Sequence, residues 1–137
     1  MDNEKQYIEE CKNFKWLQEQ WKPKSGDKVI LFDEVQILVR ESSVDGYWQV
    51  TTPEGGSKIY TQDDFYKEKC IYLPRLSTLI ELLGDRFRQL WRNHKFEWLC
   101  EYWVWDRKIA ADVAVWTPFF CTPKLACLRA LKKVKGE

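Results

Sequence analysis

Apolar residues in the C-terminal half of the chain recur at steps of three and four. Side chains at these steps share one face of a helix, because an α-helix turns once in about 3.6 residues. The residues on this face are Leu76, Leu79, Ile80, Leu83, Phe87, Leu90 and Trp91. Pro74 suits the start of a helix, since a first turn does not need its missing N–H. The spacing predicts one helix that ends at Asn93-His94, with Gly84 inside it.

A second helix is predicted from Thr122 to Val134. The Thr122 hydroxyl can cap the free amides of a first turn, and Pro123 fits the first helical position. The leucines that would face the core recur every three residues, at Leu125, Leu128 and Leu131. Cations are favourable at the end of a helix, where this chain has Lys132, Lys133 and Lys135. We interpret these lysines as a solvated helix end, with a contact to nucleic acid or anionic lipid as the alternative.

The segment between the two helices alternates in the manner of β-strands. Aromatic residues, which favour a packed pleated surface, are dense from Phe96 to Trp105, and a second alternating row runs from Ile109 to Val115. This row ends before Thr117-Pro118, because proline cannot donate to a central ladder. Both faces of the first row are largely apolar, whereas a sheet with one wet face would alternate more cleanly. We therefore expect cover on both faces, or a partner on one.

The N-terminal half is predicted to be a helix followed by short strands. Apolar residues share one face over residues 3–21, which predicts an amphipathic helix. Runs rich in branched and aromatic residues predict strands over residues 28–32, 35–40, 47–51 and 57–60. Residues 44–46 and 53–56 have the composition of tight turns. Thr61–Tyr66 is predicted to be a single helical turn with a threonine cap.

Together these elements predict an α+β fold. An N-terminal helix and a small antiparallel β-meander would pack with a C-terminal helix–strand–strand–helix unit. Residues 1–69 would hold the first part and residues 70–137 the second, within one compact domain. A chain of 137 residues suits this arrangement, because such a chain buries roughly two-thirds of its unfolded surface.

Composition and charge limit the classes of function. With 45% hydrophobic and 31% charged residues the chain is globular rather than disordered. Its net charge of +1 argues against a protein whose main contact is a phosphate backbone. The sequence has neither a run of roughly 20 apolar residues nor an apolar signal core, so we expect a cytoplasmic protein without a membrane contact. Five widely spaced cysteines favour reduced, mostly buried thiols in that compartment.

Residues that could carry catalysis or bind a metal are few. His94 is the only histidine, and no cysteines are paired as C-x-x-C in the manner of zinc sites. The glycines at 55 and 56 lack the Gly-x-x-x-x-Gly-Lys spacing of a phosphate loop. Asp33-Glu34 and Asp63-Asp64 are typical of solvated loops, although such pairs can bind a hard cation or serve a hydrolase. We therefore predict no catalytic residue, no metal, no cofactor and no enzyme activity.

The chain is rich in tryptophan, with eight in 137 residues. Most would fill the core, but tryptophan also dominates the hot spots of protein interfaces. We expect such an interface at Trp103 and Trp105, with Glu97, Glu101 and Arg107 as the charged residues around them. Stacking on single-stranded bases is a further option, which the acidic neighbours disfavour.

Two parts of the chain resemble a known group of proteins. Tyr72-Leu73-Pro74-Arg75-Leu76, the helix and the aromatic strand after it, and Cys-Thr-Pro-Lys-Leu-Ala-Cys-Leu-Arg-Ala-Leu at residues 121–131 resemble small phage and prophage proteins. Among these is the family described as a phage alpha-beta-alpha sandwich domain, whose last helix has a similar T-P-x-x-A-x-x-x-A-L character. Residues 21–27 also resemble the W-x-P-x-x-G-D openings of such proteins. The resemblance implies a bacterial host cell and supplies no catalytic residues.

We therefore expect a non-enzymatic phage or prophage accessory protein that acts by binding a protein partner. The alternative is a nucleic-acid-binding protein that uses the basic residues Lys132, Lys133, Lys135, Arg86, Arg88 and Arg92. A small hydrolase would need a concave pocket with convergent titratable groups.

Overall fold

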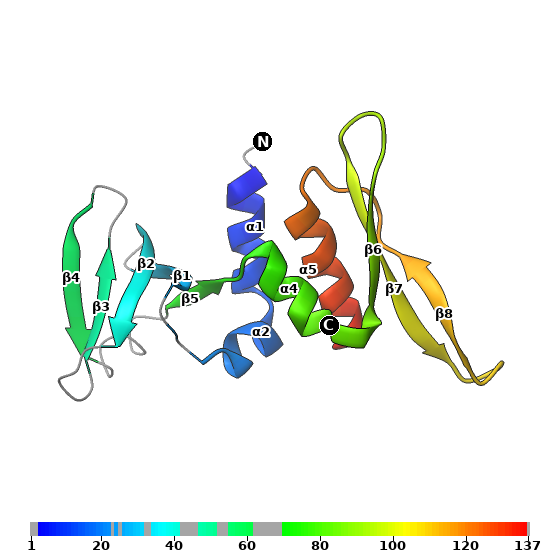
Figure 1. Ribbon diagram of the computed structural model, residues 1–137, viewed down its shortest axis with the longest axis horizontal. Helices are drawn as coiled ribbons and strands as arrows, with labels where there is room; N and C mark the ends of the chain where they lie inside the picture. The colour runs from blue at the N-terminus through cyan, green and yellow to red at the C-terminus, as the bar shows by residue number, and fades with distance from the viewer. Residues whose placement is uncertain are drawn as a thin grey trace. The chain divides into compact units, whose positions relative to one another are not determined.

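The computed structural model describes residues 3–22, 24, 26–31, 34–41, 47–51, 55–61 and 70–136. Backbone contacts group the chain into two units (Figure 1). One unit holds Cys11–Pro74, and the other holds Met1–Glu10 together with Arg75–Glu137. The sequence placed residues 1–69 in one part, whereas here the first ten residues belong with the C-terminal unit. Helices combined with antiparallel sheets confirm the predicted α+β class.

The unit of residues 11–74 contains an antiparallel sheet of five strands in the order β4-β3-β2-β1-β5. The strands are β1 (Lys28–Leu31), β2 (Glu34–Glu41), β3 (Tyr47–Thr51), β4 (Ser57–Thr61) and β5 (Ile71–Leu73). The first four confirm the predicted strands. The fifth was not predicted, and it pairs with β1 over three residues. Thr61 ends β4, and the rest of the helical turn predicted for residues 61–66 lies outside the described residues.

The single helix predicted over residues 3–21 is wrong, because the chain breaks it into α1 (Asn3–Lys12) and α2 (Lys15–Gln20). Phe14 sits at the break with φ −90° and ψ 88°, and its side chain is fully buried. Gln18 of α2 then ties the helix to β5. Its Oε1 accepts the Tyr72 amide at 2.8 Å, and its Nε2 donates to the Tyr72 carbonyl at 3.0 Å.

The helix predicted to extend to residue 93 ends ten residues earlier. The structure has α4 (Leu76–Leu83), a 3-10 turn η1 (Gly84–Arg86) and then strand β6 (Phe87–Arg92). Gly84 follows the helix with φ 55° and ψ −129°, a conformation that is essentially restricted to glycine. A β-bulge between Phe87 and Gln89 explains the misleading pattern. The bulge leaves Phe87 and Leu90 on one face of a strand although they are three residues apart, which imitates helical spacing.

The strand β6 joins two predicted strands in a second antiparallel sheet, of order β6-β7-β8. Here β7 spans Trp98–Asp106 and β8 spans Ala111–Trp116. The final helix α5 (Pro123–Val134) is confirmed, with Thr122 as its cap accepting the Leu125 amide at 3.2 Å. Figure 1 shows α5 beside this sheet, and its closest strand is β7.

The core of this unit lies between α4, α5 and β7. Its buried side chains are Leu79, Leu83, Cys100, Tyr102, Leu125, Ala126, Cys127, Leu128, Ala130 and Leu131. The helix α1 attaches to α5 through an ion pair and a contact between a cation and an aromatic ring. Lys132 Nζ lies 2.7 Å from Glu10 Oε2, and Lys124 Nζ lies 4.5 Å from the centre of the Tyr7 ring. The helix α5 therefore covers one face of the sheet, and the side chains on the opposite face of β7 point away from this helix.

Candidate functional site

The face of the sheet turned away from α5, called the outer face below, is set by alternation along β7. Cys100 and Tyr102 are buried on the α5 side, so Leu99, Glu101 and Trp103 point to the other side. Antiparallel partners share a face. The residues that register adds to the outer face are Gln89 and Trp91 on β6, and Asp112, Ala114 and Trp116 on β8.

Large aromatic side chains on the outer face are exposed. The exposed fraction is 50% for Trp91, 53% for Trp105 and 62% for Trp116. Phe119, in the segment after β8, is exposed as well. Large apolar side chains cost free energy when they face water, at about 25 cal/mol for each Å² of apolar surface. Their gathering on one face is typical of a binding surface.

A carboxylate lies at the centre of this aromatic face. Glu101 is only 6% exposed, although it is charged. Its Oε2 accepts hydrogen bonds from Arg88 Nη1 and, at 3.0 Å, from Gln89 Nε2. The Arg88 guanidinium also lies 5.2 Å from the centre of the Trp103 ring. Among the residues that the structure describes, no donor reaches the other carboxylate oxygen, Oε1.

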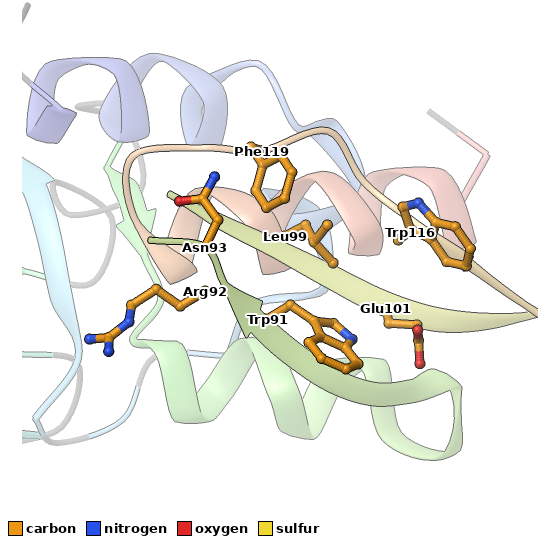
Figure 2. Close-up of a pocket in the computed structure, with 7 residues that line it drawn as sticks. All are labelled: Trp91, Arg92, Asn93, Leu99, Glu101, Trp116 and Phe119. Atoms are coloured by element: carbon orange, nitrogen blue, oxygen red, sulfur yellow. The ribbon is translucent and has the colours of Figure 1, made fainter. Parts of the chain in front are cut away.

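A pocket of about 330 Å³ opens on the outer face (Figure 2). The residues that line it are Trp91, Arg92, Asn93, Leu99, Glu101, Trp116 and Phe119. Trp116 is the direct cross-strand partner of Glu101, and Trp91 is the partner of Leu99. Figure 2 shows the Arg92 guanidinium turned away from the other lining residues. This guanidinium lies 5.0 Å from the centre of the Phe96 ring, so the Arg92 stem and not its charge borders the pocket.

A second pocket, of about 350 Å³, lies where the end of α5 meets β7. It gathers cations and indoles, since its lining includes Trp103, Trp105, Arg107 and Lys133. Arg86 also borders it, with Nη1 2.9 Å from the Asp112 carboxylate. That ion pair removes much of the positive charge that Arg86 would add.

The five predicted partner-binding residues lie in three places. Trp103, Trp105 and Glu101 lie on β7, and their side chains are on the outer face. Glu97 lies in the turn between β6 and β7, where its Oε1 accepts a hydrogen bond from Asn93 at 3.0 Å. Arg107 lies in the turn at the other end of β7. The structure thus places the first three on one face, brings Arg107 to Trp103 and Trp105 at the second pocket, and leaves Glu97 at the other end of β7.

Sequence reasoning did not name the three aromatic residues of the pocket, Trp91, Trp116 and Phe119, as site residues. It assigned Trp91 to a helix, and it counted Trp116 within the predicted strand pair without naming it as a binding residue. One signal could have found Trp116, because it continues the alternation of Asp112 and Ala114. Trp91 could not be found in this way, since the bulge in β6 hides the strand period.

The thiols and the histidine do not converge on the pocket. Cys100 and Cys127 are buried between β7 and α5, and their side chains form a hydrogen bond. This hydrogen bond, together with burial, raises the pKa of the Cys127 thiol. Burial raises the pKa of Cys70, in the other unit, to about 12. Raised values keep these thiols protonated at neutral pH, which makes them poor nucleophiles and poor metal ligands. His94 is exposed in the turn between β6 and β7.

Comparison of the chain with protein-family models, with curated proteins and with solved structures finds no match. Among the helices of the described residues, none has both the length and the apolar character of a membrane span.

Proposed function

We propose that this chain is a non-enzymatic accessory protein of a phage or prophage that acts by binding a protein partner through the outer face. The observation that carries the proposal is the group of exposed aromatic side chains around the pocket, Trp91, Trp116 and Phe119. Tryptophan is enriched in the residues that contribute most to binding free energy at protein interfaces. The phage assignment is supported by the resemblance of residues 72–76 and 121–131 described above.

The proposed interface therefore lies at a different part of the sheet from the interface that the sequence predicted at Trp103 and Trp105. Trp103 is half-buried beneath the Arg88 guanidinium, so it offers a partner less surface than its position in the sequence suggests. Trp105 is exposed and can extend the contact toward the second pocket. The centre of the proposed interface is the pocket around Trp116.

The test is capture of proteins from a bacterial lysate by the immobilised full chain. The change is the double substitution Trp91→Ala and Trp116→Ala, and both side chains are at least half exposed, so the fold should be retained. A partner of the outer face should be captured by the wild-type chain and lost with this variant. Removal of a hot-spot tryptophan costs about 2 kcal/mol or more, which is at least about thirtyfold in affinity for each residue.

The matched control is Ile109→Ala. Ile109 is also exposed and apolar, at 60%, but it lies in the turn between β7 and β8. Capture should survive this change. If no captured protein distinguishes the double variant from Ile109→Ala, binding through the outer face is refuted.

Nucleic-acid binding is the second candidate, and the second pocket is the observation that favours it. Arg107 and Lys133 border the same cavity as Trp103 and Trp105, and single-stranded nucleic acid is bound by such mixtures of cations and aromatic rings. Other basic residues of the predicted set are engaged with carboxylates, which weakens this candidate. The pairs are Lys132 with Glu10, Arg86 with Asp112 and Arg88 with Glu101.

Fluorescence anisotropy with a labelled single-stranded oligonucleotide tests the second candidate. Binding should weaken steeply as salt is raised, and the double substitution Arg107→Ala and Lys133→Ala should reduce the salt dependence by about two phosphate contacts. If the anisotropy of the oligonucleotide does not rise on addition of the protein even at low salt, nucleic-acid binding is excluded.

A further inference from the structure

We propose that the pocket on the outer face receives an arginine side chain of the protein partner. The guanidinium donates a hydrogen bond to Glu101 Oε1, and its plane rests against the indole rings of Trp116 and Trp91. This inference rests on the proposed function, because it names the group that the partner presents to the outer face.

The first argument is the incomplete hydrogen bonding of a buried carboxylate. The Glu101 side chain is 8% exposed, and both of its hydrogen bonds end on Oε2. A carboxylate oxygen that loses water without gaining a donor costs free energy, more than the roughly 1–3 kcal/mol of a neutral polar group, so a partner that covers Oε1 must bring a donor. Glu101 lines the pocket, and we infer that a donor entering the pocket bonds to Oε1, the oxygen that no described protein group contacts. The group that fits the pocket must therefore carry an N–H or O–H.

The second argument is the composition of the walls. Trp116 is the direct cross-strand neighbour of Glu101, so a group bonded to the carboxylate must pass beside an indole ring. Tryptophan is the aromatic side chain with the strongest attraction for cations, at about 0.5–2 kcal/mol. Leu99 and Phe119 supply apolar surface to the same pocket. The walls thus favour a side chain with an apolar stem and a flat cationic end.

The third argument concerns charge. Two arginines lie close by, and neither places its charge in the pocket. Arg88 is bound to Oε2 and lies over Trp103, while Arg92 lies over Phe96 and Trp98. A second carboxylate, Glu97, is hydrogen-bonded to the pocket residue Asn93. Neither guanidinium is therefore bonded to Glu101 Oε1, although Arg88 compensates the Glu101 charge through Oε2.

Arginine fits these three conditions better than lysine. Its guanidinium is planar and stacks on aromatic faces, and it carries five N–H donors in a rigid arrangement. It is also more weakly hydrated than an ammonium, so its transfer into a largely apolar pocket costs less. A volume of about 330 Å³ is at the small end of ligand pockets, which suits a single long side chain.

The experiment titrates the full ¹⁵N-labelled chain with a blocked pentapeptide that has one arginine between glycines. The readout is the indole N–H signals of the eight tryptophans, and those of Trp91 and Trp116 are assigned with phenylalanine substitutions. We expect saturable shifts of these two signals, with a dissociation constant on the order of 1 mM for one isolated side chain. A peptide with lysine should bind less tightly, and one with citrulline, which has the same shape without the charge, at least about tenfold less tightly.

Two variants make the result specific to the pocket. Glu101→Gln keeps the size of the side chain and should weaken binding of the arginine peptide about tenfold or more. Trp116→Leu removes an exposed ring and should weaken binding comparably, in a position where the fold does not depend on the side chain. Absence of shifts at Trp91 and Trp116 up to roughly 20 mM peptide, or equal binding of the citrulline peptide, would overturn the inference.

The outcomes separate this inference from the function on which it rests. If the lysate partner is lost with Trp91→Ala and Trp116→Ala but the arginine peptide does not bind, the proposed interface is supported and the arginine site is refuted. If the arginine peptide binds but capture of no protein depends on the two tryptophans, the arginine site is supported and the proposed function is refuted.

Discussion

Substitution of Gly84 by alanine separates the observed fold from the continuous helix that the hydrophobic spacing suggests. In a helix that extends from Pro74 to Asn93, Gly84 would be an interior residue. Alanine is better than glycine in that setting by about 1 kcal/mol, so Gly84→Ala would stabilise the protein. In the observed structure the same substitution should instead lower the free energy of unfolding.

The magnitude follows from the backbone at this position. Gly84 has φ 55° and ψ −129°, outside the regions that residues with a Cβ adopt readily. Such a conformation costs about 1–3 kcal/mol for a non-glycine residue. A Cβ added at Gly84 would meet no atom within 4 Å, so a steric clash adds nothing to this cost. We therefore expect Gly84→Ala to lower the free energy of unfolding by about 1–3 kcal/mol.

Urea unfolding of the full chain, followed by tryptophan fluorescence and by circular dichroism, measures this difference. Gly56→Ala is the matched control, because Gly56 is exposed and does not have a positive φ. The control reports the effect of alanine on the unfolded chain, which is worth about 0.4–1 kcal/mol in the stabilising direction. If Gly84→Ala stabilises the protein as much as Gly56→Ala does, the helix does not end at Leu83 and the assignment of β6 is wrong.

Two further predictions concern stability. Thr122→Ala removes the acceptor of the Leu125 amide at 3.2 Å and should lower the free energy of unfolding by about 1 kcal/mol. Thr122→Ser keeps a hydroxyl and should lower it much less. Equal losses of stability for the two variants in thermal unfolding would contradict the role of Thr122 as the helix cap. The pKa values of Cys127 and Cys70 are raised on folding, the first by a hydrogen bond with Cys100 and by burial, the second by burial to about 12. Above about pH 8.5 the unfolded chain loses thiol protons that the folded chain keeps, so the free energy of unfolding should fall by up to about 1.4 kcal/mol per pH unit for each thiol. Urea unfolding at pH 7 and pH 10 measures this fall, and an unchanged fall in Cys127→Ala and Cys70→Ala would refute the assignment.

The strands β1 to β4 and the helix α5 could be predicted because their signals are local. Runs of branched and aromatic residues mark these strands, and Thr122-Pro123 marks the start of the helix by chemistry within one turn. The strand β5 could not be predicted in this way, since it has three residues and exists through its pairing with β1. Its amide and carbonyl at Tyr72 are further fixed by Gln18, which lies 54 positions away in the sequence.

The strand β6 escaped prediction for a different reason. A bulge adds one residue between the inward-facing Phe87 and Leu90, and the period of two is lost. Helical spacing and a bulged strand then place apolar residues at the same sequence positions. Gly84 was the one local clue, because a glycine inside a helical pattern lowers the propensity for helix and marks a possible end.

The sequence predicted the type of candidate site but not its position on the sheet. The density of tryptophan indicated an aromatic surface, and Trp103, Trp105 and Glu101 do lie on one face of β7. The pocket depends on the register that puts Trp116 opposite Glu101 and Trp91 opposite Leu99. This register depends on the turns that join consecutive strands and on the bulge in β6, which the hydrophobic pattern did not reveal.

The carboxylate at the centre of the outer face has a consequence for specificity. A buried carboxylate that is paired with an arginine often contributes no more to stability than an apolar residue of the same size would. An apolar side chain in place of Glu101 would enlarge the apolar surface beside Trp116, and a larger exposed apolar surface promotes non-specific association. If the outer face binds a protein partner as proposed, the carboxylate disfavours partners that bring no donor, because its Oε1 would then be shut away from water without a hydrogen bond. Under that proposal the tryptophans of the outer face supply most of the binding free energy, and Glu101 sets the specificity.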